Sequence, residues 1–125
     1  MPNIEPDLNL SFLYEIADGS NEFIIESIDM FLANTPALME SLSRALSDGE
    51  WATVASTAHI LKSNVGFFGM PVSQELMQEI EIAARASQPD HALLLTKFNE
   101  VKELVSANLT SLQKIKAELE AGDQS

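Results

Sequence analysis

An all-α fold is predicted for this chain: an up-and-down antiparallel four-helix bundle with a short additional N-terminal helix. Apolar residues recur every three or four positions along most of the sequence, as they do on the buried face of a helix. The segments with this pattern are separated by short turns that contain glycine or proline, which favours antiparallel neighbours. The 125 residues are enough for one domain with a hydrophobic core, covering 1–125, with loose tails expected at 1–6 and 121–125.

Two helices are expected in the first part of the chain. The first covers residues 7–17, with Leu10, Leu13 (or Phe12) and Ile16 on its apolar face, and an Asp-Gly pair ends it. The second is capped by Ser20 or Asn21 and carries a longer apolar face: Ile24, Ile28, Phe31, Leu32, Leu38, Leu42 and Leu46. Pro36 interrupts this pattern, which fits either one kinked helix or two helices that meet at the proline.

Three further helices are expected after Gly49. The first begins near residue 50, ends between Gly66 and Gly69, and has one apolar stripe: Trp51, Val54, Ala58, Leu61, Val65 and Phe68. The next begins at Pro71, ends near residue 86, and directs four residues to the core: Val72, Leu76, Ile80 and Ala83. The last helix follows a break at 87–90 and is the longest, and Asn108 stands where its pattern requires an apolar residue.

His59 lies away from the middle of the apolar stripe on its helix, at about 100° per residue, so its side chain is expected to reach solvent. Apart from Lys62, its neighbours on that side of the helix are small: Ala52, Ala55, Ser56, Ser63 and Gly66. Because exposed helix faces usually carry long polar side chains, this strip indicates a surface where another macromolecule can approach the imidazole closely.

The stretch from Ala58 to Met70 resembles the motif of the histidine-containing phosphotransfer (HPt) domains, A-H-x-L-K-G-S-x-x-x-x-G. Five positions of the motif match: Ala58, His59, Leu61, Lys62 and Gly69. Gly66 stands where a small residue is usual, and Ser63 replaces the glycine that normally follows the lysine. The family has a similar helical-bundle architecture, so the resemblance extends over nearly the whole chain.

The resemblance implies that His59 accepts a phosphoryl group, a role that suits imidazole because its neutral form is a nucleophile near pH 7. Lys62 is a neighbour on the helix surface and can partly neutralise the incoming charge. Ser63 is a weaker candidate that could donate a hydrogen bond to a phosphoryl oxygen. On the following helix, Gln74 or Gln78 could bond the imidazole or the phosphoryl group, and Arg85 is a second candidate cation.

Docking of a partner is expected to depend on small side chains at Ala55, Ser56 and Gly66, where bulk would block close approach. Ile60 and Phe67 are candidates for an apolar rim around the histidine, although core packing is the default interpretation for Phe67. Gly69 is expected to be a turn residue.

The formal net charge of −12 with only seven Lys and Arg residues argues against nucleic acid and anionic membranes as partners. There is no cysteine, no signal-peptide pattern and no run of about 18 apolar residues, so a cytoplasmic location is expected. His91 is the only other histidine and no H-E-x-x-H spacing occurs, so no metal site is expected. A Gly-rich nucleotide loop is also absent, and we expect no autokinase activity.

The predicted function is therefore that of a phosphocarrier rather than an autonomous enzyme. The resemblance implies that His59 takes a phosphoryl group from an aspartyl phosphate on a receiver domain and passes it to another receiver. The implied partners are receiver domains of response regulators or a hybrid sensor histidine kinase, with Mg²⁺ on the receiver and no cofactor on this chain. A monomer is expected. Two alternatives stay open: a receiver- or kinase-binding module that carries no phosphate, and a structural bundle.

Overall fold

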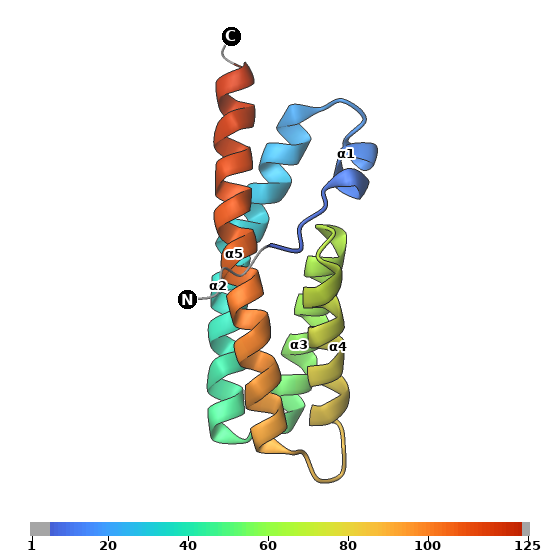
Figure 1. The fold of residues 1–125 in the computed structure, drawn as a ribbon, viewed down its shortest axis with the longest axis vertical. Coiled ribbons are helices and arrows are strands. Elements are labelled where there is room, and N and C mark those ends of the chain that lie inside the picture. Colours follow the sequence, from blue (N-terminus) through green and yellow to red (C-terminus); the bar gives the residue numbers. More distant parts are fainter. Residues whose placement is uncertain (1–5, 124–125) are drawn as a thin grey trace.

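The computed structural model describes residues 6–123, which form five α-helices (Figure 1). The helices are α1 (Ser11–Ala17), α2 (Asn21–Asp48), α3 (Trp51–Phe67), α4 (Pro71–Ala84) and α5 (His91–Asp123). Helices α2, α3, α4 and α5 contact one another in chain order, and α5 closes the bundle against α2. Helix α1 packs on α2, at the end of the bundle where α3 and α4 stop short of the longer helices. The predicted all-α bundle with a short N-terminal helix is confirmed.

Helix ends are determined by local sequence in several places. The Ser20 side chain accepts a hydrogen bond from the backbone N–H of Phe23 at 3.1 Å and so caps α2. Gly49, with φ of 68°, provides the left-handed residue that ends the same helix. Pro71 occupies the first turn of α4, where its missing N–H costs nothing. Asp90 accepts from the backbone N–H of Leu93 at 3.1 Å, at the start of α5.

Helix α2 continues through Pro36, so the predicted alternative of two separate helices is wrong. A proline inside a helix removes one backbone hydrogen bond and costs about 3 kcal/mol. Buried apolar side chains on both sides of it, such as Phe31 and Leu42, fix the two halves to the same core. Tertiary packing therefore offsets the local preference of the proline to begin a new helix.

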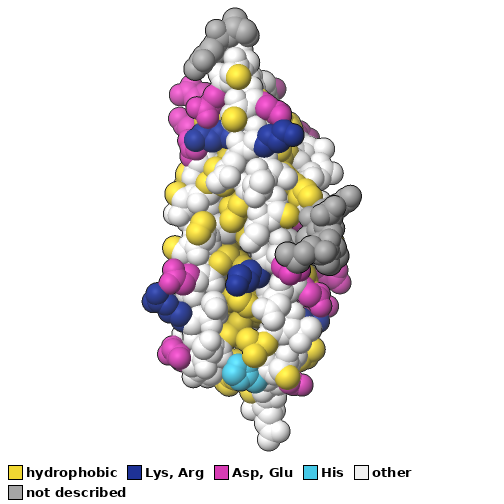
Figure 2. Space-filling model, turned by 60° about the vertical axis from the view of Figure 1, so that its left-hand side comes forward, with side chains coloured by type: hydrophobic (Ala, Val, Ile, Leu, Met, Phe, Trp, Pro, Cys, Tyr) yellow, Lys and Arg dark blue, Asp and Glu magenta, His cyan; other side chains and the backbone are white. Residues whose placement is uncertain are grey.

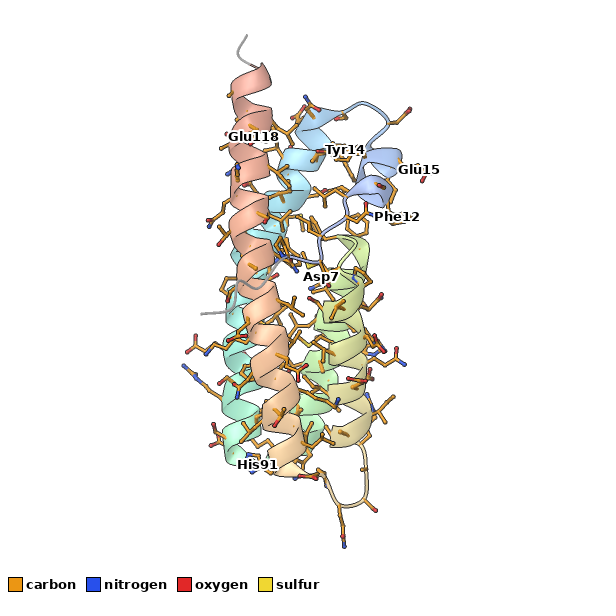
Figure 3. All side chains as sticks on the ribbon, in the orientation of Figure 1. Asp7, Phe12, Tyr14, Glu15, His91 and Glu118 are labelled. Carbon is orange, nitrogen blue, oxygen red and sulfur yellow. The ribbon has the colours of Figure 1, made fainter. Side chains whose placement is uncertain are left out.

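Residues 7–10 are not helical, so α1 begins later than the sequence predicts. These residues, the N-terminal strap, cross the turn between α3 and α4 and reach α5 (Figure 3). The Asp7 carboxylate accepts from the backbone N–H and the hydroxyl of Ser73, at 2.8 and 3.1 Å. It also accepts from Nδ2 of Asn108 at 2.7 Å. Asn108 is thus a fully buried polar contact rather than a gap in the apolar face.

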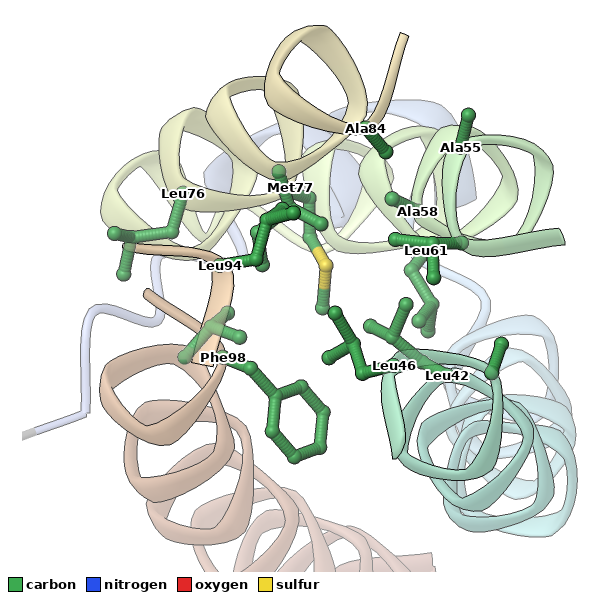
Figure 4. Packing of buried hydrophobic residues seen from close by; sticks show 14 of the residues in the cluster. Leu42, Leu46, Ala55, Ala58, Leu61, Leu76, Met77, Ala84, Leu94 and Phe98 are labelled. Atoms are coloured by element: carbon green, nitrogen blue, oxygen red, sulfur yellow. The ribbon is translucent and has the colours of Figure 1, made fainter. Parts of the chain in front are cut away.

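The core fills the space between the four long helices. Side chains from all four converge on its centre: Leu42, Leu46, Leu61, Met77, Leu94 and Phe98 (Figure 4). A second cluster lies at the α1 end and includes Leu13, Ile28, Phe31, Val65, Phe68 and Leu112. The predicted apolar stripe of the His59 helix is buried as expected, with Trp51 half-buried at its edge.

Three apolar residues that the sequence assigns to buried faces are exposed. In α1, Leu13 is fully buried, whereas Phe12 and Ile16 are 53% and 44% exposed, because only one side of this short helix meets the bundle. In α4, Val72 is 47% exposed and Ser73 occupies the buried position of the first turn. The buried polar contact of Ser73 with Asp7 explains why an apolar pattern misplaces this turn.

The C-terminal end differs from the tail expected at 121–125. Residues 121–123 belong to α5, while residues 1–5 and 124–125 lie outside the described part of the chain. Within the described residues, no helix is long and apolar enough to cross a membrane. On the face drawn in Figure 2, basic side chains are scattered among acidic and apolar ones rather than gathered in a patch.

Candidate functional site

The antiparallel hairpin of α3 and α4 brings His59 beside Glu81. The turn is closed by backbone hydrogen bonds from Gly69 to Gly66 at 3.1 Å and from Met70 to Val65 at 3.0 Å. His59 lies as many residues before Met70 as Glu81 lies after it. Because the two helices run antiparallel from this turn, residues at equal distances from it lie at the same level along the helix axes. The hairpin therefore places the imidazole and the carboxylate opposite each other.

His59 is held on one side of its ring and open on the other. Its Nδ1 lies 3.0 Å from Oε2 of Glu81, and the side chain is 57% exposed. Because an ionised carboxylate only accepts hydrogen bonds, the proton is on Nδ1, which donates it. In the neutral form of the ring, Nε2 then carries a lone pair on the opposite side, and it is the nitrogen with nucleophilic character.

Glu81 is a nearly buried carboxylate surrounded by basic groups. Its side chain is 11% exposed, Lys62 Nζ lies 2.8 Å from Oε1, and the Arg85 guanidinium lies 3.0 Å from Oε2. The hydrogen bond from Lys62 lowers the pKa of Glu81, burial opposes this effect, and the hydrogen bond from Arg85 and the charges of Lys62 and His59 lower it further. The carboxylate therefore stays ionised at neutral pH.

The structure brings both predicted cations to the candidate histidine. Lys62 comes from the same helix and is 24% exposed, while Arg85 comes from the end of α4 and is 60% exposed. Both bind the carboxylate that also binds His59. The two positive charges therefore lie on the Glu81 side of the imidazole, each joined to His59 through the shared carboxylate.

Sequence reasoning missed Glu81 and pointed to glutamines in its place. The imidazole is bonded by Glu81 rather than by Gln74 or Gln78. Gln74 lies over Gly66, where an added Cβ atom would come within 2.3 Å of its Nε2 atom. Gln78 is exposed and shares a shallow groove on the outer face of α4 with Gln74. The symmetric placement of residues about the turn was the signal that could have identified Glu81.

The small residues around His59 divide into two groups. Ala55 is 3% exposed and packs in the core, so its predicted place on an open docking strip is wrong. It belongs to the core cluster that also contains Ala58 of α3 and Ala84 of α4. Ser56 and Ser63 are exposed, and the Ser63 hydroxyl donates to the backbone oxygen of His59 at 3.4 Å. Gly66 is partly covered by Gln74.

An apolar surface lies on the α2 side of His59. Ile60 is 48% exposed, and Phe67 is half-buried with its ring 5.9 Å from that of Phe12 in an edge-on contact. Beside Phe67 a cleft of about 280 Å³ is lined by Ser27, Met30, Phe31, Asn34, Thr35, Asn64, Phe67 and Phe68. Met30 and Phe12 were missed from sequence because their positions depend on how α1 and α2 pack on α3.

His91 does not take part in this site. Its ring lies 5.5 Å from that of Trp51, in an edge-on contact at the opposite end of α3 from the turn that carries Gly69. Among the described residues, no three histidine, cysteine or acidic side chains form a group that could hold a metal ion.

Comparison with known proteins agrees with the motif and the fold. The family model described as Hpt domain matches residues 26–124. No curated protein matches this sequence. Among solved structures, the HPT domain of a sensor hybrid histidine kinase from Shewanella is similar, with a TM-score of 0.74 and 26% identity over 90% of this chain and 95% of that domain. The chain belongs to the Hpt domain family.

Proposed function

We propose that this chain is a histidine phosphotransfer protein of a phosphorelay, with His59 as the phosphoryl acceptor. The family match and the structural neighbour support a phosphotransfer role in a phosphorelay. The observation that carries the assignment to His59 is the state of its ring. Glu81 occupies Nδ1, and the exposed imidazole presents Nε2 with its lone pair free.

The proposed reaction transfers a phosphoryl group from a receiver aspartate to His59. The Nε2 lone pair attacks phosphorus, the N–P bond forms as the P–O bond to the aspartate breaks, and the electron pair leaves with the receiver carboxylate. The reverse sequence delivers the group to the aspartate of a second receiver. Mg²⁺ and the acidic pocket would be contributed by the receiver, whereas this chain supplies the nucleophile and its surroundings.

Lys62 and Arg85 would stabilise the phosphorylated form. Both carry their charge within hydrogen-bonding distance of Glu81, next to the imidazole. A phosphoryl group on Nε2 would bring negative charge across the ring from Glu81, and the attraction of the two cations for this charge would favour the phosphorylated form. Ser63 is exposed on the same helix, one turn from His59, and is a weaker candidate for a phosphoryl contact.

The receiver would dock on the apolar surface between His59 and α2. Ile60 and Phe67 form its near side, and Phe12 and Met30 extend it. Met30 is 65% exposed, a large apolar side chain left open to solvent at the edge of a cleft. A small apolar centre beside the reacting atom suits a transient complex that must release its partner after transfer. A receiver partner implies a cytoplasmic location for this chain. The whole docking surface lies on one copy of the bundle, so a monomer is sufficient for docking.

The direct test is transfer of radiolabelled phosphate from phosphorylated receiver domains. Wild type should acquire label that is lost in acid and retained in alkali, as expected of phosphohistidine. A His59→Gln variant should acquire none, whereas His91→Gln should be labelled like wild type. Label on His59→Gln would contradict the assignment. Binding of receivers without any label on wild type would instead identify an interaction module that carries no phosphate.

A further inference from the structure

The cleft between α2 and α3 lies outside the cluster formed by His59, Glu81 and their two cations. Its volume is about 280 Å³, and its lining residues come from the two helices and from Phe68, which directly follows α3. We propose that this cleft binds a small neutral aromatic molecule with one hydrogen-bonding group, such as a phenol or an indole, and that the bound molecule competes with receiver docking. The binding is independent of the proposed function, whereas the competition rests on it.

The inner wall of the cleft is aromatic. Phe31 and Phe68 are buried with their ring centroids 4.7 Å apart, and Phe67 is half-buried beside them. An aromatic ligand would add an edge-on or offset contact to these rings, the geometries that aromatic pairs prefer. Among the described residues, none that lines the cleft is charged, so a charged ligand would lose hydration without gaining a counter-ion. The lining therefore favours a neutral aromatic ring.

Thr35 contributes a buried hydroxyl without a partner to this lining. The residue is 0% exposed, and its Oγ1 makes no hydrogen bond to any described residue. By contrast, the hydroxyls of Thr96 and Thr110 donate to the backbone carbonyl four residues earlier, at 3.0 and 3.2 Å. Burying an unpaired hydroxyl costs free energy. Its presence in the wall of a cleft therefore indicates that a ligand provides the missing partner.

Two amide side chains complete the polar lining, Asn34 from α2 and Asn64 from α3. Neither side chain is hydrogen-bonded to another described residue. An amide both donates and accepts, so it can bind a phenol O–H or an indole N–H. Apolar walls with a few polar groups are typical of small-molecule sites, which usually have volumes of about 300 Å³ or more. A cleft at the lower end of this range suits a molecule with one or two rings.

The cleft shares residues with the proposed docking surface. Phe67 and Met30 line it, and Ile60 precedes Asn64 by four residues on the same face of α3. A molecule between Phe67 and Met30 would occupy apolar surface that a docked receiver must cover. His59 is not part of the lining, so the bound molecule would leave the imidazole open to small phosphodonors. Occupation of the cleft should therefore inhibit transfer from a receiver and spare the chemistry of the histidine.

Binding can be measured by NMR titration of the full chain with p-cresol and with toluene, which lacks the hydroxyl. We expect a Kd for p-cresol of about 1 mM or tighter, as for a ligand of this size, with shifts of the Asn34 and Asn64 side-chain amides. In an apolar cavity toluene would bind better, because the phenol loses its hydrogen bonds to water. Here p-cresol should bind about fivefold more tightly, the equivalent of one net hydrogen bond.

Thr35→Val tests the role of the buried hydroxyl. The change keeps the shape of the side chain and should not lower the thermal unfolding temperature, because the lost hydroxyl has no partner. It should abolish the preference for p-cresol over toluene. Thr110→Val, on the exposed side of α5, is the matched control and should keep it. Equal binding of both molecules to wild type, or no binding of p-cresol at about 10 mM, would overturn the proposed site.

The competition is tested with a receiver and with phosphoramidate, a small phosphodonor. At three times its Kd, p-cresol should lower the apparent receiver affinity about fourfold, as competitive binding requires, and leave labelling of His59 by phosphoramidate unchanged. Unchanged receiver affinity at a saturated cleft would overturn the competition. If p-cresol does not bind but Thr35→Val weakens receiver binding, the cleft accepts a receiver side chain and the ligand site is wrong. Wild type that accepts no phosphate from any donor would contradict the proposed function, whereas the titration would still decide the site.

Discussion

The backbone oxygen of Asn9 occupies the space that a side chain on Gly69 would need. A Cβ atom built on Gly69 would lie 1.7 Å from that oxygen, and the Asn9 N–H donates to the Gly69 carbonyl at 2.8 Å. The turn that follows the histidine helix is therefore in direct backbone contact with the N-terminal strap. Gly69 belongs to the HPt motif, and this contact gives a structural reason for a glycine there in this chain.

Replacing Gly69 with alanine should destabilise the fold strongly. Gly69 and Gly19 both have positive φ, 66° and 86°, but a Cβ atom on Gly19 would meet nothing within 4 Å. Gly19→Ala should cost only the backbone strain, about 1–2 kcal/mol. Gly69→Ala should cost at least about 2 kcal/mol more, since the strap must also move. Urea unfolding of the two variants measures the difference, and equal losses would show that the strap contact carries no energy.

Replacing Asp7 with alanine should cost about 2–4 kcal/mol of unfolding free energy. The change removes an acceptor that binds Ser73 and Asn108, and it leaves the fully buried Asn108 amide without its partner. Glu103→Ala, an exposed change on α5, is the control and should stay within about 0.5 kcal/mol of wild type. If Asp7→Ala lost no more unfolding free energy than Glu103→Ala, water would be replacing the carboxylate as the hydrogen-bond acceptor.

Gly66 should tolerate alanine better than its place near His59 suggests. The added Cβ atom meets the flexible end of the Gln74 side chain, which is exposed and can move away. Since alanine favours a helix over glycine by about 1 kcal/mol, Gly66→Ala in a Gln74→Ala background should raise thermal stability. The receiver affinity of Gly66→Ala, measured in the wild-type and in the Gln74→Ala background, tests docking. A large loss of affinity in both backgrounds would show that the glycine is needed for close approach of a partner.

Glu81 should make stability depend on pH in the acid range. Its pKa is lowered in the folded protein, chiefly by the hydrogen bond from Lys62, from an ordinary value of 4.5. Its contribution is therefore fully present above pH 4.5 and is lost as pH falls through the lower folded pKa. Wild type should exceed Glu81→Gln by about 1–2 kcal/mol at neutral pH, and this difference should shrink below pH 4.5. A constant difference down to pH 3 would contradict the lowered pKa.

A charge on the apolar surface beside His59 should weaken receiver binding. Met30→Glu places a carboxylate at the edge of the cleft, and it should lower affinity about tenfold or more while leaving stability nearly unchanged, because the side chain is 65% exposed. Leu93→Glu, on α5 and 44% exposed, is the matched control. Titration of an unphosphorylated receiver measures both. Equal affinities for the two variants would place the docking surface elsewhere.

The sequence alone determined the helices and the candidate nucleophile. Apolar spacing of three and four residues, together with caps such as Ser20 and Pro71, depends on interactions within one helix or one turn. The HPt motif is likewise local, so His59, Lys62 and Gly69 could be identified from one continuous stretch. These features are encoded near the residues that they describe, and the structure confirms the all-α bundle and places His59 on an exposed helix face.

The tertiary structure decided which polar groups meet across helices. Glu81 reaches His59, Asp7 reaches Asn108, and Ala55 is buried rather than open, because of the register and close approach of separate helices. The apolar periodicity of a helix determines which of its faces is buried, but it does not determine the position of the helix along the axis of a neighbouring helix. Continuation through Pro36 was decided in the same way, since burial on both sides of the proline outweighs its local preference to start a helix.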